Sequence, residues 1–277
     1  MKFGCHVSIK EGYLGAAELA KSLGAEAYQF FPKNPRSLGV KNFNETDATA
    51  CKQFCKQNKL VSITHTPYPT SLTPEDNKQE DVIQSLQNDL EISEACGAIG
   101  VVVHFGKQKD SKDPLASYHV MINILNAVLE NWEGQCKILL ENNAGKPGSM
   151  GTTMEELVQV RKLCDDPDHI GFCLDTCHAF ASEFWTGENT DELIMKGSEL
   201  GYFNYLEAIH LNNSKYPVGS GKDRHANIFG HGYIEASQFE LFLQQPSVKK
   251  VPMILETPSE FGITKEKEIK QLYDRWG

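Results

Sequence analysis

Six short apolar runs along the chain each end beside a side chain that can bind a metal ion. The runs and the residues that follow them are Leu60–Thr64 before His65, Ile99–Val103 before His104, Lys137–Leu140 before Glu141, Ile170–Leu174 before Asp175, Leu206–Ile209 before His210 and Val251–Leu255 before Glu256. Apolar runs of this length are typical of buried strands in a parallel sheet. Successive run ends lie 34 to 46 residues apart, which is about one strand plus one helix. The pattern therefore predicts repeated strand–helix units whose strands end on polar side chains.

The segments between these runs have the periodicity of amphipathic helices. We expect helices at Tyr13–Leu23, Asp47–Asn58, Glu80–Cys96, Leu115–Asn131, Thr153–Cys164, Thr190–Leu200, Ile234–Gln244 and Lys265–Trp276. Two further strands are expected at Phe3–Ser8 and Ala25–Phe31, which brings the number of strands to eight. Eight alternations without a break in composition predict an α/β protein, a single (β/α)8 TIM barrel formed by residues 1–277.

The long connections of this predicted barrel all follow the carboxyl ends of strands. They are Pro32–Thr46, Thr66–Gln79, Phe105–Pro114, Asn142–Gly151, Thr176–Asn189 and Leu211–Tyr233. Barrel enzymes carry their active sites on this face. The six strand-end side chains should therefore meet at one mouth, surrounded by these loops.

Three further candidate ligands lie in the loops, namely His178, Asp223 and His225. The nine candidates are thus His65, His104, Glu141, Asp175, His178, His210, Asp223, His225 and Glu256. A single such residue is more often a hydrogen-bonded structural group, but six at the same end of successive strands favour a metal site. Mixed imidazole and carboxylate ligands suit zinc, with manganese as an alternative metal. Nine ligands are enough for two or three ions, an arrangement suited to phosphodiester hydrolysis.

Composition places the chain among ordinary globular proteins. It has 277 residues, of which 40% are hydrophobic and 23% charged, and no apolar stretch reaches 18 residues. The first residues, MKFGCHVS, lack the features of an export signal. The eight cysteines are not spaced like those of a stapled secreted domain. We therefore expect a cytoplasmic protein that is not secreted and does not bind a membrane.

The charge distribution bears on the substrate. The formal net charge of −10 argues against a broadly basic surface. Ten basic residues nevertheless fall in loops on the proposed active face: Lys33, Arg36, Lys41, Lys107, Lys109, Lys112, Lys146, Lys215, Lys222 and Arg224. This clustering indicates a local site for an anionic backbone.

Several motifs resemble those of the endonuclease IV family of apurinic/apyrimidinic (AP) endonucleases, along almost the whole chain. They are GCHVS (4–8), FPKNPRS (31–37), HTPY (65–68), ENNAG (141–145), LDTCHAFA (174–181), HLNNSK (210–215), DRH (223–225) and LETP (255–258). The resemblance implies a xylose-isomerase-like TIM barrel with three zinc ions. It also implies a hydrolase of DNA repair that cuts 5′ to an abasic site, leaving a 3′-hydroxyl and a 5′-deoxyribose phosphate, and that trims blocked 3′ ends.

The resemblance also implies a role for each site residue. His65, His104 and Glu141 would hold the first zinc ion, and Glu141 would bridge to the second, which Asp175, His210 and Glu256 complete. His178, Asp223 and His225 would hold the third. Glu141, Glu256 and His104 would act in catalysis through a hydroxide held by the first two ions.

For the DNA side, the resemblance assigns contacts to Arg36 and Tyr68, which would push into the duplex, and to Asn34 and Lys33 beside them. The partner would be double-stranded DNA with abasic sites or blocked 3′ ends, and the protein would be a monomer. The chain departs from the family pattern at Phe105, where proline is usual, at Asn213, where aspartate is common, at Asn143, where threonine is common, and by an extra residue near Phe229.

A metal-dependent sugar isomerase or epimerase on the same barrel is the alternative. Such sites generally use one or two manganese or magnesium ions held mostly by carboxylates. The five imidazoles and the additional DRH motif in this chain argue against that reading.

Overall fold

The protein folds as a closed barrel of parallel strands, as the sequence pattern predicts. The computed structural model describes residues 1–110 and 112–277, so Ser111, within the predicted connection Phe105–Pro114, lies outside the described residues. Within these residues the strands follow one another around the barrel in chain order, and β10 pairs with β1 to close it. The barrel strands are β1 (Phe3–His6), β2 (Ala27–Phe30), β3 (Val61–His65), β4 (Gly100–His104), β5 (Lys137–Glu141), β6 (Ile170–Asp175), β7 (Leu206–His210) and β10 (Met253–Leu255).

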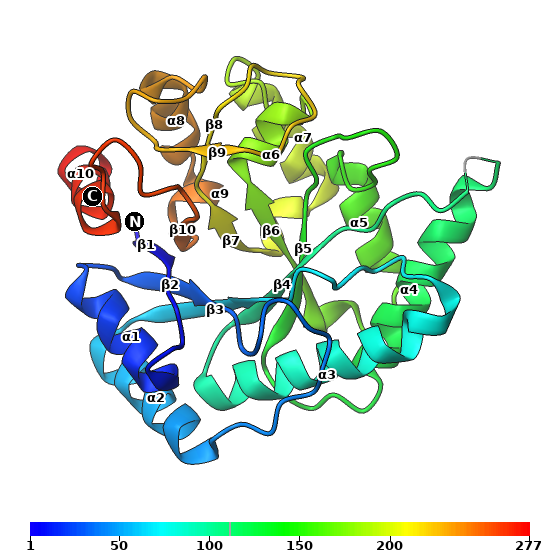
Figure 1. Cartoon of the computed structure of the whole chain (residues 1–277). Helices are drawn as coiled ribbons and strands as arrows, with labels where there is room; N and C mark the ends of the chain where they lie inside the picture. The colour runs from blue at the N-terminus through cyan, green and yellow to red at the C-terminus, as the bar shows by residue number, and fades with distance from the viewer. Residues whose placement is uncertain (111) are drawn as a thin grey trace.

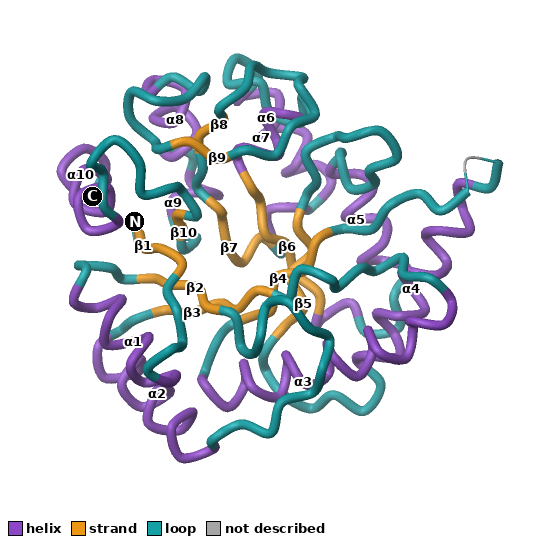
Figure 2. Tube along the Cα trace, in the orientation of Figure 1, coloured by secondary structure: helices purple, strands orange, loops and turns teal. Residues whose placement is uncertain are grey.

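Helices surround the strands in a ring, and long loops lie over the barrel mouth (Figures 1 and 2). The α-helices are α1 (Gly12–Ser22), α2 (Glu45–Asn58), α3 (Gln79–Cys96), α4 (Pro114–Leu129), α5 (Met154–Leu163), α6 (Thr176–Ala181), α7 (Thr190–Leu200), α8 (Ala236–Leu243), α9 (Pro246–Lys249) and α10 (Lys265–Trp276). Short 3-10 turns occur at η1 (Asp76–Lys78), η2 (Pro167–His169) and η3 (Tyr202–Asn204). The eight helices expected from periodicity are all present, with ends that differ by a few residues.

Two predicted loops contain structure that the sequence pattern did not indicate. The connection Thr176–Asn189 begins with α6, which starts directly after Asp175 because the carboxylate of that residue accepts a hydrogen bond from the backbone N–H of His178 at 2.8 Å. The connection Leu211–Tyr233 contains an antiparallel hairpin of β8 (Asn213–Ser214) and β9 (His225–Ala226). Both elements carry candidate metal ligands, so they fix parts of the site that a mobile loop would leave undefined.

Two layers of side chains fill the barrel. Small and branched residues, one from each of seven strands, form a buried cluster: Ala27, Ile63, Val102, Leu139, Cys173, Ala208 and Ile254. Side chains two residues apart on a strand point to the same side. The residues two positions further along therefore share the interior of the barrel: Gln29, His65, His104, Glu141, Asp175, His210 and Glu256. On β1, His6 is paired in register with Gln29, which places a polar residue at the end of every barrel strand.

The two ends of the chain meet at the seam of the barrel (Figure 1). The backbone N–H of Phe3 on β1 donates to the hydroxyl of Tyr273 on α10 at 3.2 Å. Close packing at the seam also requires Gly4, because a Cβ atom there would lie 1.5 Å from the carbonyl oxygen of Ala27. Helix α10 and strand β2 thus both pack closely against β1.

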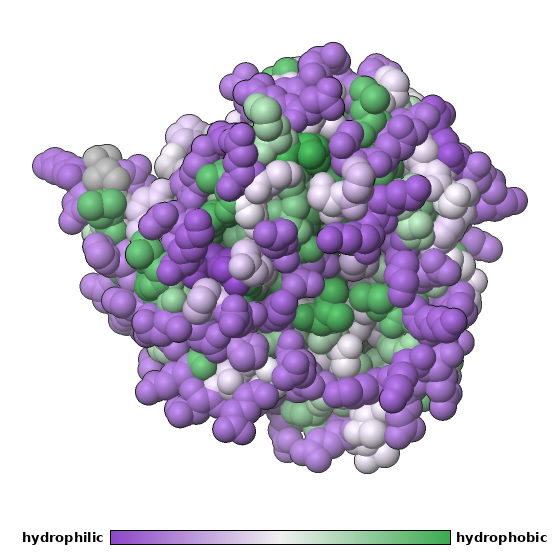
Figure 3. All heavy atoms as spheres, turned by 180° about the vertical axis from the view of Figure 1, so that it is seen from behind, coloured by the Kyte–Doolittle hydropathy of each residue, from purple (hydrophilic) through white to green (hydrophobic). Residues whose placement is uncertain are grey.

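The outer surface is mostly hydrophilic. The view from behind shows hydrophilic residues over most of that face, with hydrophobic residues in small separate groups (Figure 3). In residues 1–110 and 112–277, no helix combines the length and the apolar character that crossing a membrane requires.

Candidate metal centre

The nine candidate ligands converge at the barrel mouth, where they form three groups. In each group the ligand atoms all lie within 4.8 Å of one another. Seven of the nine residues come from strand ends or from α6, and Asp223 and His225 come from the β8–β9 segment. These groups have the same members as the three sets that the sequence resemblance implies.

The first group joins the ends of three adjacent strands. His65 Nε2 lies 3.6 Å from Oε2 of Glu141, and His104 Nδ1 lies 3.5 Å from the same oxygen. The side chain of His104 is 42% exposed, whereas those of His65 and Glu141 are buried. This group therefore opens to solvent on the His104 side.

The second group uses the other oxygen of the same glutamate. Nδ1 of His210 lies 2.8 Å from Glu141 Oε1, 3.3 Å from Glu256 Oε2 and 3.9 Å from Asp175 Oδ2. Glu141 thus presents one carboxylate oxygen to each group. A carboxylate placed in this way can bridge two cations.

The third group lies beside the second. His178 Nε2 and His225 Nε2 lie 3.3 and 3.4 Å from the same oxygen of Asp223. His225 Nε2 is also 3.5 Å from Oδ2 of Asp175, which links this group to the second one. The three groups therefore form one continuous cluster.

The hydrogen bonds of Gln29 show which ring nitrogen of His210 carries a hydrogen and which one faces the carboxylates. The amide nitrogen of Gln29 lies 2.7 Å from Glu256 Oε1 and 3.0 Å from His6 Nδ1. Because a carboxylate only accepts, this nitrogen is the NH₂ group, and the amide oxygen faces His210 Nε2 at 2.7 Å. Nε2 must then carry a hydrogen, so a neutral His210 directs the lone pair of Nδ1 at carboxylate oxygens.

Such a convergence of acceptors needs a cation. Glu141 Oε2, His178 Nε2 and His225 Nε2 are also buried, and they have no hydrogen-bond partner among the residues that the structure describes. Unpaired buried polar atoms are costly, and native proteins rarely retain them without a bound group. Imidazole and carboxylate donors suit divalent zinc, so the residues present fit metal ions in all three groups.

The electrostatics show how strongly these groups depend on one another. Burial would raise the pKa of Glu141, but the imidazoles of His104 and His210 outweigh it and hold the pKa well below its ordinary value. Burial opposes protonation of His178, but Asp175 and Asp223 outweigh it and raise the pKa of its imidazole to about 10. Glu141 is therefore held ionised, as a carboxylate ligand must be, whereas His178 has to lose a proton to bind a metal ion.

Three amides that the sequence pattern did not single out hold the ligands in place. Gln29 contacts both His210 and Glu256. Asn212 donates to Asp175 Oδ2 at 2.8 Å and accepts from the backbone of Glu256 at 2.9 Å. Asn142 accepts from the backbone N–H of Asp175 at 2.8 Å. The available signal was position: Gln29 ends a strand, and each asparagine closely follows a strand-end ligand.

Cys177 is near Asp175 and His225 but is a poor candidate for a ligand. Its thiol donates to the carbonyl oxygen of Arg224, and burial raises its pKa. A protonated thiol does not bind zinc, since the thiolate is the ligand. These contacts indicate a packing role for this cysteine.

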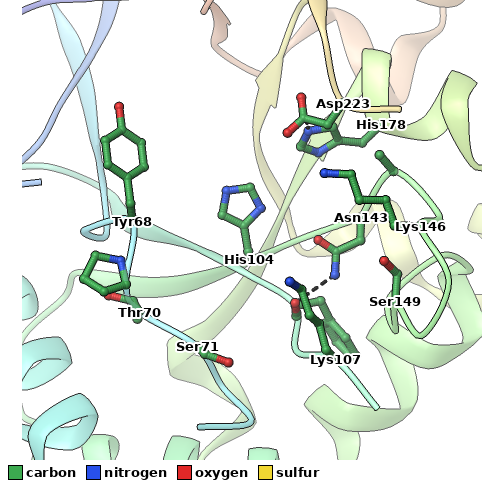
Figure 4. Close-up of a pocket in the computed structure, with 13 residues that line it drawn as sticks. Tyr68, Thr70, Ser71, His104, Lys107, Asn143, Lys146, Ser149, His178 and Asp223 are labelled. Atoms are coloured by element: carbon green, nitrogen blue, oxygen red, sulfur yellow. Dashed lines mark hydrogen bonds and ion pairs between the residues drawn. The ribbon is translucent and has the colours of Figure 1, made fainter. Parts of the chain in front are cut away.

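Two neighbouring pockets, of about 300 and 360 Å³, adjoin the cluster and share Tyr68, His104, His178 and Asp223. In the first, Tyr68 lies on one side, His178 and Asp223 lie on the other, and His104 lies between them (Figure 4). Lys107 and Lys146 also line the first pocket. Lys265, which the sequence pattern did not suggest, lines the second and donates to the carbonyl oxygen of His6. Three ammonium groups are thus placed beside the cluster.

The four residues predicted to contact DNA do not all reach the surface. Arg36 and Asn34 are exposed in the loop after β2, and Tyr68 is 70% exposed in the loop after β3. Lys33 is buried, and its ammonium contacts Asp89 Oδ1 at 3.1 Å and the carbonyl oxygen of Ser85 at 2.6 Å. The prediction for Lys33 was wrong, because an ammonium enclosed by α3 cannot reach an external phosphate.

Two departures from the family pattern have a structural reason. The amide of Asn213 donates to the carbonyl oxygens of Ile228 and Ile234 at 3.0 and 2.9 Å, which an aspartate could not do. The amide of Asn143 donates to the carbonyl oxygens of Phe105 and Met150, both at 2.8 Å. Both asparagines therefore hold loops at the barrel mouth by donating to backbone.

Comparisons with known proteins agree with this geometry. Residues 17–276 match a family described as "Xylose isomerase-like TIM barrel". The chain is 41% identical over 267 residues to a "Probable endonuclease 4" of Symbiobacterium thermophilum, covering 95% of this chain and 96% of that protein. It superposes on the crystal structure of endonuclease IV from Thermus thermophilus with a TM-score of 0.86 and 27% identity, covering 100% of this chain and 98% of the other.

The fold is also shared with more distant proteins. A crystal structure of a D-tagatose 3-epimerase-like protein superposes with a TM-score of 0.70 at 18% identity, covering 99% of this chain and 96% of that one. Identity this low indicates a common barrel and carries no information about activity.

Proposed function

The chain belongs to the endonuclease IV family and is an AP endonuclease, and from this premise we propose that it hydrolyses DNA immediately 5′ to an abasic site with three zinc ions. The observation that carries the proposal is the sharing of Glu141 between two ligand groups while a third group adjoins them. The products are a 3′-hydroxyl and a 5′-deoxyribose phosphate. We also propose that the enzyme trims blocked 3′ ends, since these present the same phosphodiester chemistry.

In this proposal two of the three zinc ions would share Glu141 as a ligand. The first ion would be held by His65, His104 and Glu141, and the second by Glu141, Asp175, His210 and Glu256. The third would be held by His178, Asp223 and His225. Bound zinc ions supply Lewis acidity for phosphodiester hydrolysis, because they activate water and stabilise charge on the leaving oxygen.

The chain's own residues position the metal-binding groups and form the pocket for the substrate. Glu141, buried and ionised, holds the spacing between the first two groups, and with Glu256 and His104 it forms the proposed catalytic set. Gln29 and Asn212 fix the rings and carboxylates around it. The pocket between Tyr68 and Asp223 receives the phosphate and the baseless sugar beside His104, the most exposed residue of the first group.

Recognition of the lesion falls to the loops after β2 and β3. The exposed guanidinium of Arg36 and ring of Tyr68 can fill the space that a missing base leaves in a duplex. Extruding a nucleotide that has no base pair to break costs little, which favours abasic DNA over intact DNA. Lys107, Lys146 and Lys265 would contact phosphates and so add affinity without sequence preference.

A sugar isomerase on the same barrel is the competing function. Three adjoining groups with five imidazoles exceed what one or two carboxylate-held ions require. Exposed Arg36 and Tyr68 beside the pocket also have no evident use with a free sugar. We therefore favour the nuclease, acting as a cytoplasmic monomer formed by one domain of residues 1–277.

An incision assay tests the proposal. A duplex with one abasic-site analogue should be cut directly 5′ to the lesion by the zinc-loaded protein. The cut should disappear with a chelator and fall by at least about a hundredfold in Glu141→Ala or Glu256→Ala, because each removes a metal ligand. An intact duplex after full zinc loading refutes the hydrolase assignment, and turnover of a ketose or aldose would favour the isomerase.

A further inference from the structure

The loop that carries Arg36 is held at both ends by one helix. At its start, the ammonium of Lys33 is enclosed by α3, 3.1 Å from Asp89 and 2.6 Å from the carbonyl oxygen of Ser85. At its end, Asn88 of the same helix accepts from the backbone N–H of Lys41 at 2.8 Å and donates to its carbonyl oxygen at 3.2 Å. Residues 33–41, which we call the β2 loop, are thus fixed on α3 by buried polar contacts.

Between these anchors the β2 loop is ordered by its own turns. The side chain of Asn34 accepts from the backbone N–H of Arg36 at 3.0 Å, and its carbonyl oxygen accepts from Ser37 at 3.3 Å. Side-chain bonds of this kind pre-form a turn. Arg36 is therefore presented on a defined backbone while its side chain remains exposed.

The same loop fixes the second lesion-facing residue. The backbone N–H of Tyr68 donates to the carbonyl oxygen of Pro35 at 2.8 Å. The ring of Tyr68 also packs edge-on against Phe31, with 5.2 Å between centroids, and Phe31 in turn contacts the ring of His65. Arg36 and Tyr68 therefore belong to one rigid unit, which is attached to α3 on one side and to a metal ligand on the other.

The anchor needs an explanation, because the side chains of Lys33 and Asp89 are 2% and 0% exposed. Removing two opposite charges from water carries a large desolvation cost, and apolar residues of similar volume often replace such a pair without loss of stability. Stability alone does not account for the pair. The pair lies at the base of the loop that presents Arg36, which points to a role in fixing the conformation of this loop.

We propose that Lys33 and Asp89 are positioning residues, whose buried pair sets the β2 loop so that Arg36 and Tyr68 fit an abasic site together. This inference rests on the proposed function. It assigns lesion recognition to a preformed unit of Arg36 and Tyr68, which we call the wedge. Lys33 then acts by positioning the wedge, in place of the phosphate contact expected from the sequence. The metal cluster itself does not depend on the pair.

The double variant Lys33→Met/Asp89→Leu tests the proposal, since it removes both charges and leaves no unpaired ion. Its KM for the single-lesion duplex should rise about tenfold or more, because small misplacements of binding groups are costly in the reaction. Zinc content should not change, nor should hydrolysis of bis(p-nitrophenyl) phosphate, a small diester that does not need the wedge. Arg36→Ala should show a comparable rise in KM for the duplex.

The control is Lys196→Met/Glu155→Leu, which removes an exposed ion pair of 2.8 Å between α7 and α5. It should leave KM at the wild-type value. Lys33→Gln, which keeps a donor for the Ser85 carbonyl oxygen, gives a second and milder test in the same direction if the double variant does not fold.

Three outcomes distinguish the two proposals. A wild-type KM in both Lys33 variants overturns the positioning role. A parallel fall in zinc content or in small-diester hydrolysis also overturns it, because the pair would then act on the metal cluster. Failure of the wild-type protein to cut the duplex refutes the proposed function.

Discussion

One amide, that of Gln29, determines how two candidate metal ligands are oriented. Its NH₂ group donates to Glu256 and its oxygen accepts from Nε2 of His210, so Nδ1 of His210 faces the cluster. Such contacts to metal-binding histidines fix the tautomer and the direction of the ring. The side chain is fully buried, so no water can replace it.

We therefore expect Gln29→Leu to weaken zinc binding by about ten- to a hundredfold. Leucine has a similar volume but offers no acceptor to His210 and no donor to Glu256. The measurement is zinc retained by the protein in competition with a chelator of known affinity. Gln53→Leu, on the exposed face of α2, serves as the control. Equal retention by both variants would contradict the orienting role.

Asp89 gives a prediction about pH. Burial raises its pKa to about 7, although Lys33 opposes the shift. The unfolded chain releases this proton near pH 4, so between about pH 4 and pH 7 the folded state binds more protons than the unfolded state. The contribution of Asp89 to stability is therefore present at low pH and is lost as pH rises through 7.

Comparison with Asp89→Asn, which has no charge to titrate, isolates this effect from the metal cluster. From pH 5 to pH 7 the free energy of unfolding of the wild type should fall by about 2 kcal/mol relative to the variant, in chemical denaturation of metal-free protein. Parallel pH profiles for the two proteins would show that Asp89 titrates normally.

The sequence pattern pointed to the candidate ligands but not to the residues that hold them in position. A histidine or carboxylate at a strand end is a recognisable metal ligand, whereas an amide at the same position, such as Gln29, has many ordinary uses. Lys33 was placed in a loop correctly, but its buried partner Asp89 lies on helix α3, 56 positions further along the chain. Neither pattern nor composition can reveal such a contact.

At the scale of elements, short structures inside predicted loops complete the site. α6 positions His178, and the β8–β9 hairpin positions His225. Both escaped prediction because a helix of six residues and strands of two residues are too short to show periodicity. Their order comes from capping by Asp175 and from the backbone contacts of Asn213.

Asn213 is the residue on which the hairpin and the following loop depend. We expect Asn213→Asp to lower the free energy of unfolding by about 2–3 kcal/mol, because it would face two backbone carbonyl oxygens without a donor. Chemical denaturation measures the change. Asn44→Asp, at the exposed N-cap of α2, should cost almost nothing, since its side chain only accepts a hydrogen bond there. A stability of Asn213→Asp equal to that of the wild type would exclude this role.

At the scale of the whole molecule, barrel closure brings residues 65 to 256 to one mouth. Seven strands contribute one polar residue two positions after the apolar interior layer, and six of these residues are candidate ligands, so register alone brings them into a ring. The strand ends could therefore be predicted from the sequence. Pairing of β1 with β10 closes the barrel and so brings Glu256, near the end of the chain, to the same mouth as candidate ligands from much earlier strands. The formal charge of −10 need not oppose DNA binding, because lysines at the mouth, together with the proposed zinc ions, would determine the local field.

The most direct test of this account is incision of a single-lesion duplex by metal-free protein as zinc is added, with zinc per chain measured in the same samples. We predict a cut immediately 5′ to the abasic site, with activity approaching its maximum only as the content nears three zinc ions per chain. Full incision by metal-free protein, saturation of activity at one ion, or an intact duplex at complete loading would contradict it.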